Sequence, residues 1–310
     1  MSDPEIAILL AALDDRDPEV RRLAILTAAD AVHEDALPFI RASRDDDPGV
    51  RLEAVSALEG VAAEEAVEAL VDRLDDQDGE VAAAAARSLA EIQDRTAGPA
   101  LLRRLASARG AARAAILAAL RRLRLEGALA PALAALDDGL AAVRREAVMV
   151  LGYLQDPAAL PRLAERVAGD PSAEVRRAAV GALGYGSAEL VLAGLLAGLA
   201  DGDWQTREEA ASILGRLRPA GVTGALIAAL TDDYWQVRLK AAVALGKYRE
   251  TLAIPALAEA LTHPIGNLRK EAVNALGAIG HRDAVPALQA MLDDSDVEVR
   301  KAARHALAGF

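Results

Sequence analysis

One short motif recurs along this chain at a spacing so regular that it decides what the chain can fold into. A Val-Arg step or its equivalent appears ten times, and the nine successive gaps are all 30 to 32 residues. The first residues of these steps, here called anchors, are Val20, Val50, Val81, Ala112, Val143, Val175, Thr206, Val237, Leu268 and Val299. Self-similarity at one short period over a whole chain is typical of a solenoid of stacked repeats. We therefore predict one repeat domain over residues 1–310 and no second domain.

Each repeat is predicted to be two helices joined by an acidic turn. Asp17 before Pro18 and Asp47 before Pro48 have the pattern of an N-cap followed by a proline in the first turn, which marks the start of the second helix. Counted from the anchor, positions 0, 4, 5, 7 and 8 are mostly apolar and fall on one side of this helix, whereas positions 2, 3, 6 and 10 face away. Prolines near the start of the first helix are Pro38, Pro99, Pro131, Pro161, Pro255 and Pro286. Aromatic residues make up only 3% of the chain, so the core must consist of Ala, Leu and Val, which favours packed helices over strands.

An aspartate stands six residues before the arginine of most repeats. The pairs are Asp15 and Arg21, Asp45 and Arg51, Asp138 and Arg144, Asp170 and Arg176, Asp201 and Arg207, Asp232 and Arg238, and Asp294 and Arg300. Charges at fixed places in stacked repeats can form a ladder, in which each arginine bonds a carboxylate of its own or the adjacent turn. The pattern lapses at Ala82, Ser107 and His263. Because two of these lapses are neighbours and the stretch around them is rich in alanine, we predict a soft joint at residues 81–120.

These repeats resemble those of the HEAT-repeat superfamily. In particular, the text around Asp293 to Arg300 and Glu271 to Gly277 is similar to the short HEAT-like unit named for phycobilisome lyases, Asp-x-x-x-x-Val-Arg-x-x-Ala-x-x-Ala-Leu-Gly. The resemblance implies an all-α fold, a right-handed α-solenoid of about ten two-helix repeats. Members of this superfamily are mostly binding scaffolds, and a minority handle bilins, modify DNA bases or carry metals. The resemblance therefore favours a non-enzymatic adaptor or chaperone with a protein partner on its concave face. The alternative is a bilin-handling or other tetrapyrrole-handling protein, such as a bilin lyase subunit or chromophore chaperone.

Charge and residue types argue against several other functions. The net charge of −12 opposes binding to polyphosphate, so we expect no nucleic-acid partner and no DNA-base excision. A chain without cysteine has no disulfide, thiolate nucleophile or cysteine-based metal site. Di-iron enzymes of the HEAT type use several His-Glu pairs, and this chain has one, His33-Glu34, so we expect no metal and no cofactor. No pair of carboxylates stands out as catalytic among 47 acidic residues.

The sequence also predicts a cytoplasmic location. Its first residues lack the basic segment of a secretory signal. The longest uninterrupted apolar run extends from Leu190 to Ala200, which is much shorter than the roughly 20 residues needed to span a bilayer. We therefore expect no membrane partner.

Aromatic residues recur at matched places in neighbouring repeats. Trp204 and Trp235 both lie two residues before an anchor, and Tyr153 and Tyr185 both lie ten residues after one. Matched places put each pair on one face, about 10 Å apart at the usual spacing of packed helices. The rings either cover helix ends against loops or form a docking surface, for which Trp and Tyr are the residue types most enriched at hot spots.

Cations accompany the tyrosines at the tenth position after the anchor. Arg122, Arg216 and Lys247 occupy that position in other repeats, and Gly181, at the sixth position, leaves a gap between bulkier neighbours. Rings flanked by cations predict a seat for an acidic, aromatic-containing peptide or for a flat anionic small molecule. The alternative is that the cations favour a helix dipole and the tyrosines cap the core.

Overall fold

The computed structural model describes residues 4–33 and 35–310, and within them the chain is all-helical, with no strand. Twenty α-helices alternate as the first and second helices of successive repeats, so the predicted all-α solenoid of two-helix repeats is confirmed. Short 3-10 turns adjoin many of the first helices, at Ala29–His33, Arg95–Ala97, Glu126–Ala128, Pro157–Ala159, Thr251–Ala253, Arg282–Ala284 and Met291–Asp293.

The helices group into two compact units, residues 1–156 and residues 157–310. The helices of the first unit are α1 (Pro4–Ala12), α2 (Pro18–Thr27), α3 (Leu37–Ala42), α4 (Pro48–Ala57), α5 (Glu64–Arg73), α6 (Gly79–Ala90), α7 (Gly98–Ser107), α8 (Gly110–Leu123), α9 (Leu129–Ala135) and α10 (Ala141–Leu154). Those of the second unit are α11 (Leu160–Gly169), α12 (Ala173–Leu183), α13 (Ala188–Leu199), α14 (Trp204–Leu217), α15 (Thr223–Ala229), α16 (Trp235–Tyr248), α17 (Ile254–Ala260), α18 (Gly266–Ile279), α19 (Val285–Ala290) and α20 (Val297–Leu307). The single domain and the soft joint at residues 81–120 stay predictions.

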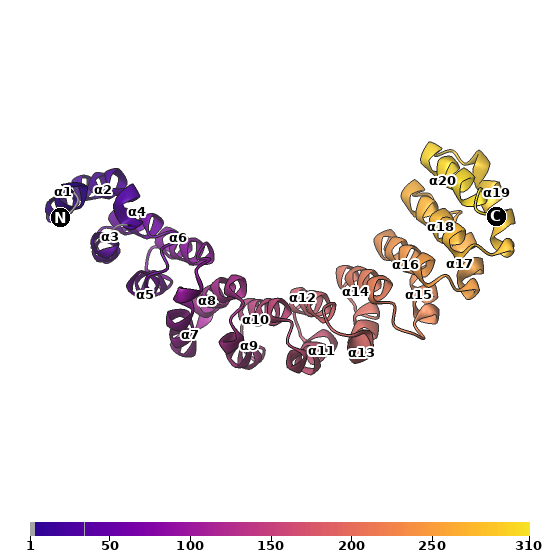
Figure 1. The fold of residues 1–310 in the computed structure, drawn as a ribbon, viewed down its shortest axis with the longest axis horizontal. Helices are drawn as coiled ribbons and strands as arrows, with labels where there is room; N and C mark the ends of the chain where they lie inside the picture. The colour runs from indigo at the N-terminus through magenta and orange to yellow at the C-terminus, as the bar shows by residue number, and fades with distance from the viewer. Residues whose placement is uncertain (1–3, 34) are drawn as a thin grey trace. The chain divides into compact units, whose positions relative to one another are not determined.

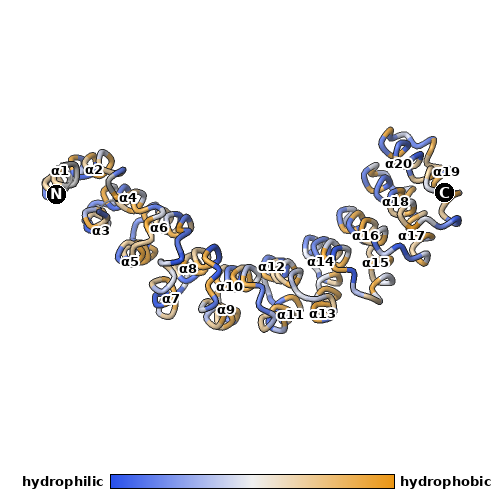
Figure 2. The backbone as a smooth tube through the Cα atoms, viewed as in Figure 1, coloured by the Kyte–Doolittle hydropathy of each residue, from blue (hydrophilic) through white to orange (hydrophobic). Residues whose placement is uncertain are grey.

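Each unit has two layers of helices. The second helices of the repeats, which carry the even numbers, pack against one another in chain order, and the first helices lie beside them as the other layer (Figure 1). In the unit of residues 157–310 the second helices lie on the inner side of the bend that this unit makes (Figure 1). Hydrophilic and hydrophobic residues are interspersed along most of the helices (Figure 2), as expected where one side packs and the other meets solvent.

The predicted helix starts are confirmed at Asp17 and Asp47. The carboxylate of Asp47 accepts hydrogen bonds from two backbone N–H groups in the first turn of α4, at 2.8 and 3.1 Å, and Asp17 accepts one in α2 at 2.9 Å. Pro18 and Pro48 are the first residues of these helices, where a missing N–H costs nothing. The same capping role falls to Asp78, Asp203 and Asp296.

The core lies between the two layers and uses the positions that the periodicity assigns to it. Nine of the ten anchors are buried, and the exception is Val20, which is 41% exposed. In α4, Val50, Ala54 and Val55 are completely buried, and so is Leu58, which follows the last residue of the helix.

Glycines set how closely neighbouring second helices approach. A Cβ atom added to Gly246 of α16 would lie 2.9 Å from the Cα atom of Ala275 in α18. One added to Gly215 of α14 would lie 2.8 Å from the Cβ atom of Ala244 in α16. These distances are too short for real side chains, so the glycine of the Ala-Leu-Gly motif is required where the second helices touch.

Candidate functional site

The aspartates and arginines of the ladder join neighbouring repeats. The Nε and Nη2 atoms of Arg207 donate to both carboxylate oxygens of Asp232, at 2.6 and 2.9 Å, and its Nη1 donates to the backbone carbonyl of Asp201 at 2.8 Å. We call each such arginine–aspartate pair a rung. Four other rungs have the same bidentate geometry: Arg21 with Asp45, Arg51 with Asp76, Arg176 with Asp201, and Arg269 with Asp294.

The rungs decide between the two partners that the sequence left open for each arginine, a carboxylate of its own turn or of the adjacent one. The carboxylate of Asp201 is held by Arg176 of the preceding repeat, so Arg207, six residues after Asp201, contacts Asp201 only through its backbone carbonyl. The spacing alone allowed the carboxylate to bond either arginine. The arginine of the preceding repeat bonds it because its planar guanidinium can donate two parallel hydrogen bonds to the carboxylate across the interface.

The rung carboxylates ionise readily although they are poorly exposed. Burial opposes the ionisation of Asp201, yet hydrogen bonds from Arg176 and from the N–H of Asp203 outweigh it and hold the pKa of the carboxyl below its ordinary value. The hydrogen bond from Arg269 is the main cause of the lowered pKa of Asp294. These charges are therefore fixed in pairs and serve the stacking of repeats.

The aromatic ring that contacts Trp204 is Tyr234 and not Trp235, with which the sequence paired it. Trp204 stacks on Tyr234, with ring centroids 5.2 Å apart and planes 9° from parallel, and the guanidinium of Arg207 lies 5.8 Å from the Tyr234 centroid. Trp235 begins α16 beside this cluster and is half-buried. Sequence reasoning missed Tyr234, which is 45% exposed, although its place directly before a tryptophan was a signal.

Tyr153 has flanking cations, but different ones from those expected. The guanidinium carbons of Arg121 and Arg124 lie 5.9 and 5.5 Å from its ring centroid, and the ring is 40% exposed. Arg122 instead pairs with Glu91 at 3.2 Å, because it projects toward the preceding second helix. The cations beside the Tyr153 ring are therefore Arg121 and Arg124, and Arg122 is not one of them.

Tyr185 and Gly181 lie in the second unit. Tyr185 is 57% exposed and follows the end of α12. A Cβ atom added to Gly181 would meet a single atom, Oε1 of Glu209 at 4.0 Å, so the expected gap is open. Because Tyr153 belongs to the other unit, the pairing of the two tyrosines stays a prediction.

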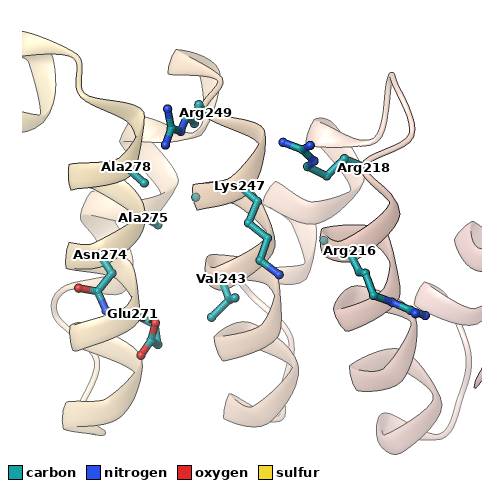
Figure 3. A pocket seen from close by; sticks show the side chains of 11 residues that line it. Arg216, Arg218, Val243, Lys247, Arg249, Glu271, Asn274, Ala275 and Ala278 are labelled. Atoms are coloured by element: carbon teal, nitrogen blue, oxygen red, sulfur yellow. Dashed lines mark hydrogen bonds between the residues drawn. The ribbon is translucent and has the colours of Figure 1, made fainter. Parts of the chain in front are cut away.

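The ends of α14, α16 and α18 enclose a groove with a volume of about 750 Å³. Cations surround it: Arg216, Arg218, Lys247 and Arg249. Gly215, Gly246 and Ala275 also line it, and Glu271 and Asn274 stand on the α18 side. Figure 3 shows Lys247 reaching from α16 toward α14 and Arg218 reaching toward α16. Positive charge at helix C-terminal ends is favoured by the helix dipole, which accounts for its position but not for its amount.

Arg216 connects the groove to the tyrosine. It turns away from Lys247 in Figure 3, and its Nη2 donates to the backbone carbonyl of Gly184 at 3.0 Å, next to Tyr185 in the chain. Two predicted residues, Arg216 and Lys247, thus line one groove. Trp204 is the first residue of α14 and lies about 18 Å along the helix from Arg216, so the tryptophans stand at the opposite end.

Sequence reasoning missed two groove residues, Arg218 and Arg249. Both have positive φ, 52° and 56°, and follow the last residues of α14 and α16. Their recurrence two residues after Arg216 and Lys247 was the available signal.

The remaining expectations concern metals and membranes. Among the described residues no group of three His, Asp or Glu side chains is placed to hold a metal ion. The His33-Glu34 pair lies outside the described residues, since Glu34 and the side chain of His33 are not placed. None of the helices in the described part of the chain has both the length and the apolar character needed to cross a membrane.

Comparison with known proteins agrees with the repeat architecture. The family of HEAT repeats matches residues 6–90, 38–121, 67–146, 129–187, 192–267 and 257–310. No curated protein matches the sequence. The phycobilisome-lyase subtype stays a prediction.

Solved structures share the fold at low sequence identity. An engineered protein is 23% identical with a TM-score of 0.54, covering 99% of both chains. YibA of Escherichia coli is 18% identical with a TM-score of 0.54, covering 99% of this chain and 98% of its own. Kap95p, described in its binding to RanGDP, is 15% identical with a TM-score of 0.64, and the match covers 98% of this chain but 51% of Kap95p. At these identities the likeness concerns the fold alone, and the repeat matches along the whole chain are what identify it: the chain belongs to the HEAT-repeat family.

Proposed function

We propose that this chain is a non-enzymatic scaffold that holds a protein partner along its layer of second helices, with an acidic segment of the partner in the groove of α14, α16 and α18. The observation that carries the proposal is unpaired positive charge. Arg218, Lys247 and Arg249 make no ion pair with any described residue, although the chain has 47 acidic residues against 35 basic ones. Cations left unpaired in an acidic protein are suited to an acidic ligand.

Aromatic contacts extend this groove. Arg216 binds the carbonyl of Gly184, the residue before Tyr185 in the chain, and the ring of Tyr185 is exposed. A segment with an aromatic side chain beside its acidic ones would cover Tyr185 and the open space at Gly181 while its carboxylates meet the cations. We include Trp204 and Trp235 as further contacts on the second helices of residues 157–310, and Tyr153 and Arg122 as contacts on the second helices of residues 1–156.

The relatives support a binding role in general terms. Kap95p uses this fold in a complex with RanGDP, and the inner layer of second helices in residues 157–310 offers a comparable surface for a macromolecule. The location in the cytoplasm and the tetrapyrrole alternative stay predictions.

The test is binding of a labelled acidic peptide that contains one tryptophan, followed by fluorescence anisotropy. The triple variant Arg218→Gln/Lys247→Gln/Arg249→Gln should bind at least about tenfold more weakly, since each lost charge-assisted hydrogen bond is worth more than 1 kcal/mol. A matched control, Arg16→Gln/Arg282→Gln/Arg304→Gln, removes three exposed cations that do not line the groove. Equal loss in both variants would mean that only net charge matters.

The flat anionic ligand has its own test at the same groove. Haem or a bilin is mixed with the protein, and its visible absorbance is followed. We expect no saturable change, because an open groove without a deep apolar pocket buries little of a tetrapyrrole. A saturable change that the triple variant abolishes would favour the tetrapyrrole function instead.

A further inference from the structure

The ladder lapses at two interfaces between repeats, and the two lapses differ in charge. A rung joins an arginine to an aspartate 24 or 25 residues later, so Ala82 and Ser107 are the two places of one missing rung. Both charges are absent there, and nothing is left unpaired. At the other lapse His263 replaces only the aspartate, and Arg238 keeps its charge.

His263 keeps the backbone role of a rung aspartate and loses its charge. Its Nδ1 accepts the N–H of Ile265 at 3.2 Å, just as the carboxylate of Asp232 accepts the N–H of Tyr234 at 2.9 Å. Its carbonyl accepts Nη1 of Arg269 at 2.8 Å, as other rung residues do. The turn is therefore intact, and only the acceptor for the preceding arginine is missing.

The terminal nitrogens of the Arg238 guanidinium have no acceptor among the described residues. Its Nε donates to the carbonyl of Asp232, and its two terminal nitrogens donate to no described residue. In Arg207, Nη1 donates to the corresponding carbonyl, that of Asp201, and Nε and Nη2 donate to the carboxylate of Asp232. Arg238 is half-buried, so a carboxylate there would meet a partly desolvated guanidinium, where such pairs are strongest.

We propose that the terminal nitrogens of Arg238, beside His263, bind an aspartate or glutamate side chain of a protein partner, which completes the rung that this chain leaves open. The other rungs show the chemistry of the occupant, because in each of them the arginine fork is filled by a carboxylate. The surroundings fit a protein segment. Trp235 lies one turn before Arg238 on α16, and the exposed Tyr234 precedes it.

This site is independent of the basic groove. Arg238 stands near the start of α16 and Lys247 near its end, about 14 Å apart along the helix. The failure of one site therefore does not imply the failure of the other.

The experiment uses the two tryptophans of the chain as reporters. Their two indole N–H resonances are followed by NMR while the full chain is titrated with a capped Gly-Glu-Gly peptide at constant ionic strength. The expected result is a saturable shift of the Trp235 resonance, and no shift with the Gly-Gln-Gly peptide.

Two variants and one control make the result specific. His263→Asp supplies an internal carboxylate, so it should weaken peptide binding at least about tenfold while raising the melting temperature. Arg238→Gln should weaken binding equally, and Arg282→Gln, which removes an exposed cation outside both sites, should leave it unchanged. Unaltered binding in His263→Asp would overturn the proposal. Saturable binding of inorganic phosphate without binding of the glutamate peptide would overturn the carboxylate assignment.

Discussion

An aspartate inside the ladder can act on three neighbours, as Asp201 does. The carboxylate of Asp201 receives two hydrogen bonds from Arg176 and one from the N–H of Asp203, while its carbonyl receives one from Arg207. One residue thus closes its own turn, ties its repeat to the preceding one and positions the arginine that ties it to the next.

Asp201→Ala should therefore destabilise the protein more than Asp233→Ala. The first change strands the guanidinium of Arg176, which is 19% exposed, at a cost of about 1 to 3 kcal/mol. Asp233 is exposed and makes no ion pair with a described residue, so its loss should cost under about 0.5 kcal/mol. Equal shifts in the urea midpoint would contradict the role given to the rung.

Acid should erase this difference between the variants. The pKa of Asp201 is lowered in the folded protein, so its contribution is present above the unfolded pKa of about 3.9 and is lost as the pH falls through the folded value. The unfolding free energies of wild type and Asp201→Ala should converge below about pH 4. A constant difference across that range would show that the lost stability is packing and not charge.

His263 also makes the stability of the protein depend on pH, here through an imidazole. Its burial, and then Arg238 and Arg269, lower its pKa, so the folded protein favours the neutral imidazole. The stability that depends on this neutral form is present above the unfolded pKa of about 6.5 and is lost as the pH falls. His263→Asp should remove that loss between pH 7 and 5 and add about 1 kcal/mol at pH 7 through a pair with Arg238. Chemical unfolding at both pH values checks both effects.

The second helices owe their close packing to a column of glycines that the repeat motif carries. Gly246 meets the backbone of Ala275, so an added methyl group cannot be accommodated by rotating a side chain. Gly224 of α15 has no atom within 4 Å of an added Cβ.

Gly246→Ala should accordingly destabilise the protein by about 1 to 3 kcal/mol, because α16 and α18 must move apart. Gly224→Ala should be neutral or stabilise the protein by up to about 1 kcal/mol through helix propensity. Thermal unfolding of both variants distinguishes close approach from the general preference of helices for alanine. A stabilised Gly246→Ala would contradict the close approach.

Much of this arrangement could be predicted from the sequence, because period, caps and core positions are local properties that repeat ten times. The partner of Asp201 could not, since own-turn and cross-repeat bonds satisfy the same spacing. The stack of Trp204 on Tyr234 was not predicted for a related reason. Equal positions in the repeats suggested that the two tryptophans would contact each other, whereas the offset between neighbouring turns brings Trp204 against Tyr234, which has a different position in its repeat. Arg218 and Arg249 escaped because they follow the helix ends, where periodicity stops.

Stability along a repeat array is a sum of repeat and interface contributions, so one weak interface stays visible. In the unit of residues 1–156, the interface between α6 and α8 lacks a rung, since Ala82 and Ser107 replace both charges. The first helices α5 and α7 partly compensate: Arg104 bonds Glu68 and Asp72, each at 2.6 Å. In the second-helix layer Arg122 of α8 pairs with Glu91 at 3.2 Å, but this pair lies at the C-terminal ends of α8 and α6, far from the missing rung, and α8 begins without a side-chain cap.

Amide exchange in the unit of residues 1–156 should therefore be fastest in residues 81–120, and within them in the first turns of α8. The decisive variant is Ala82→Arg with Ser107→Asp, which supplies both the arginine and the aspartate of the missing rung. If the new pair contributes about 1 kcal/mol, it should slow amide exchange there by about fivefold. Ala82→Arg alone is the matched control, because it adds the same aliphatic stem and charge but leaves the fork without a carboxylate. If the single and double variants protect residues 81–120 equally, the joint is a consequence of alanine-rich packing. If only the double variant protects them, the absence of one rung is what softens this interface.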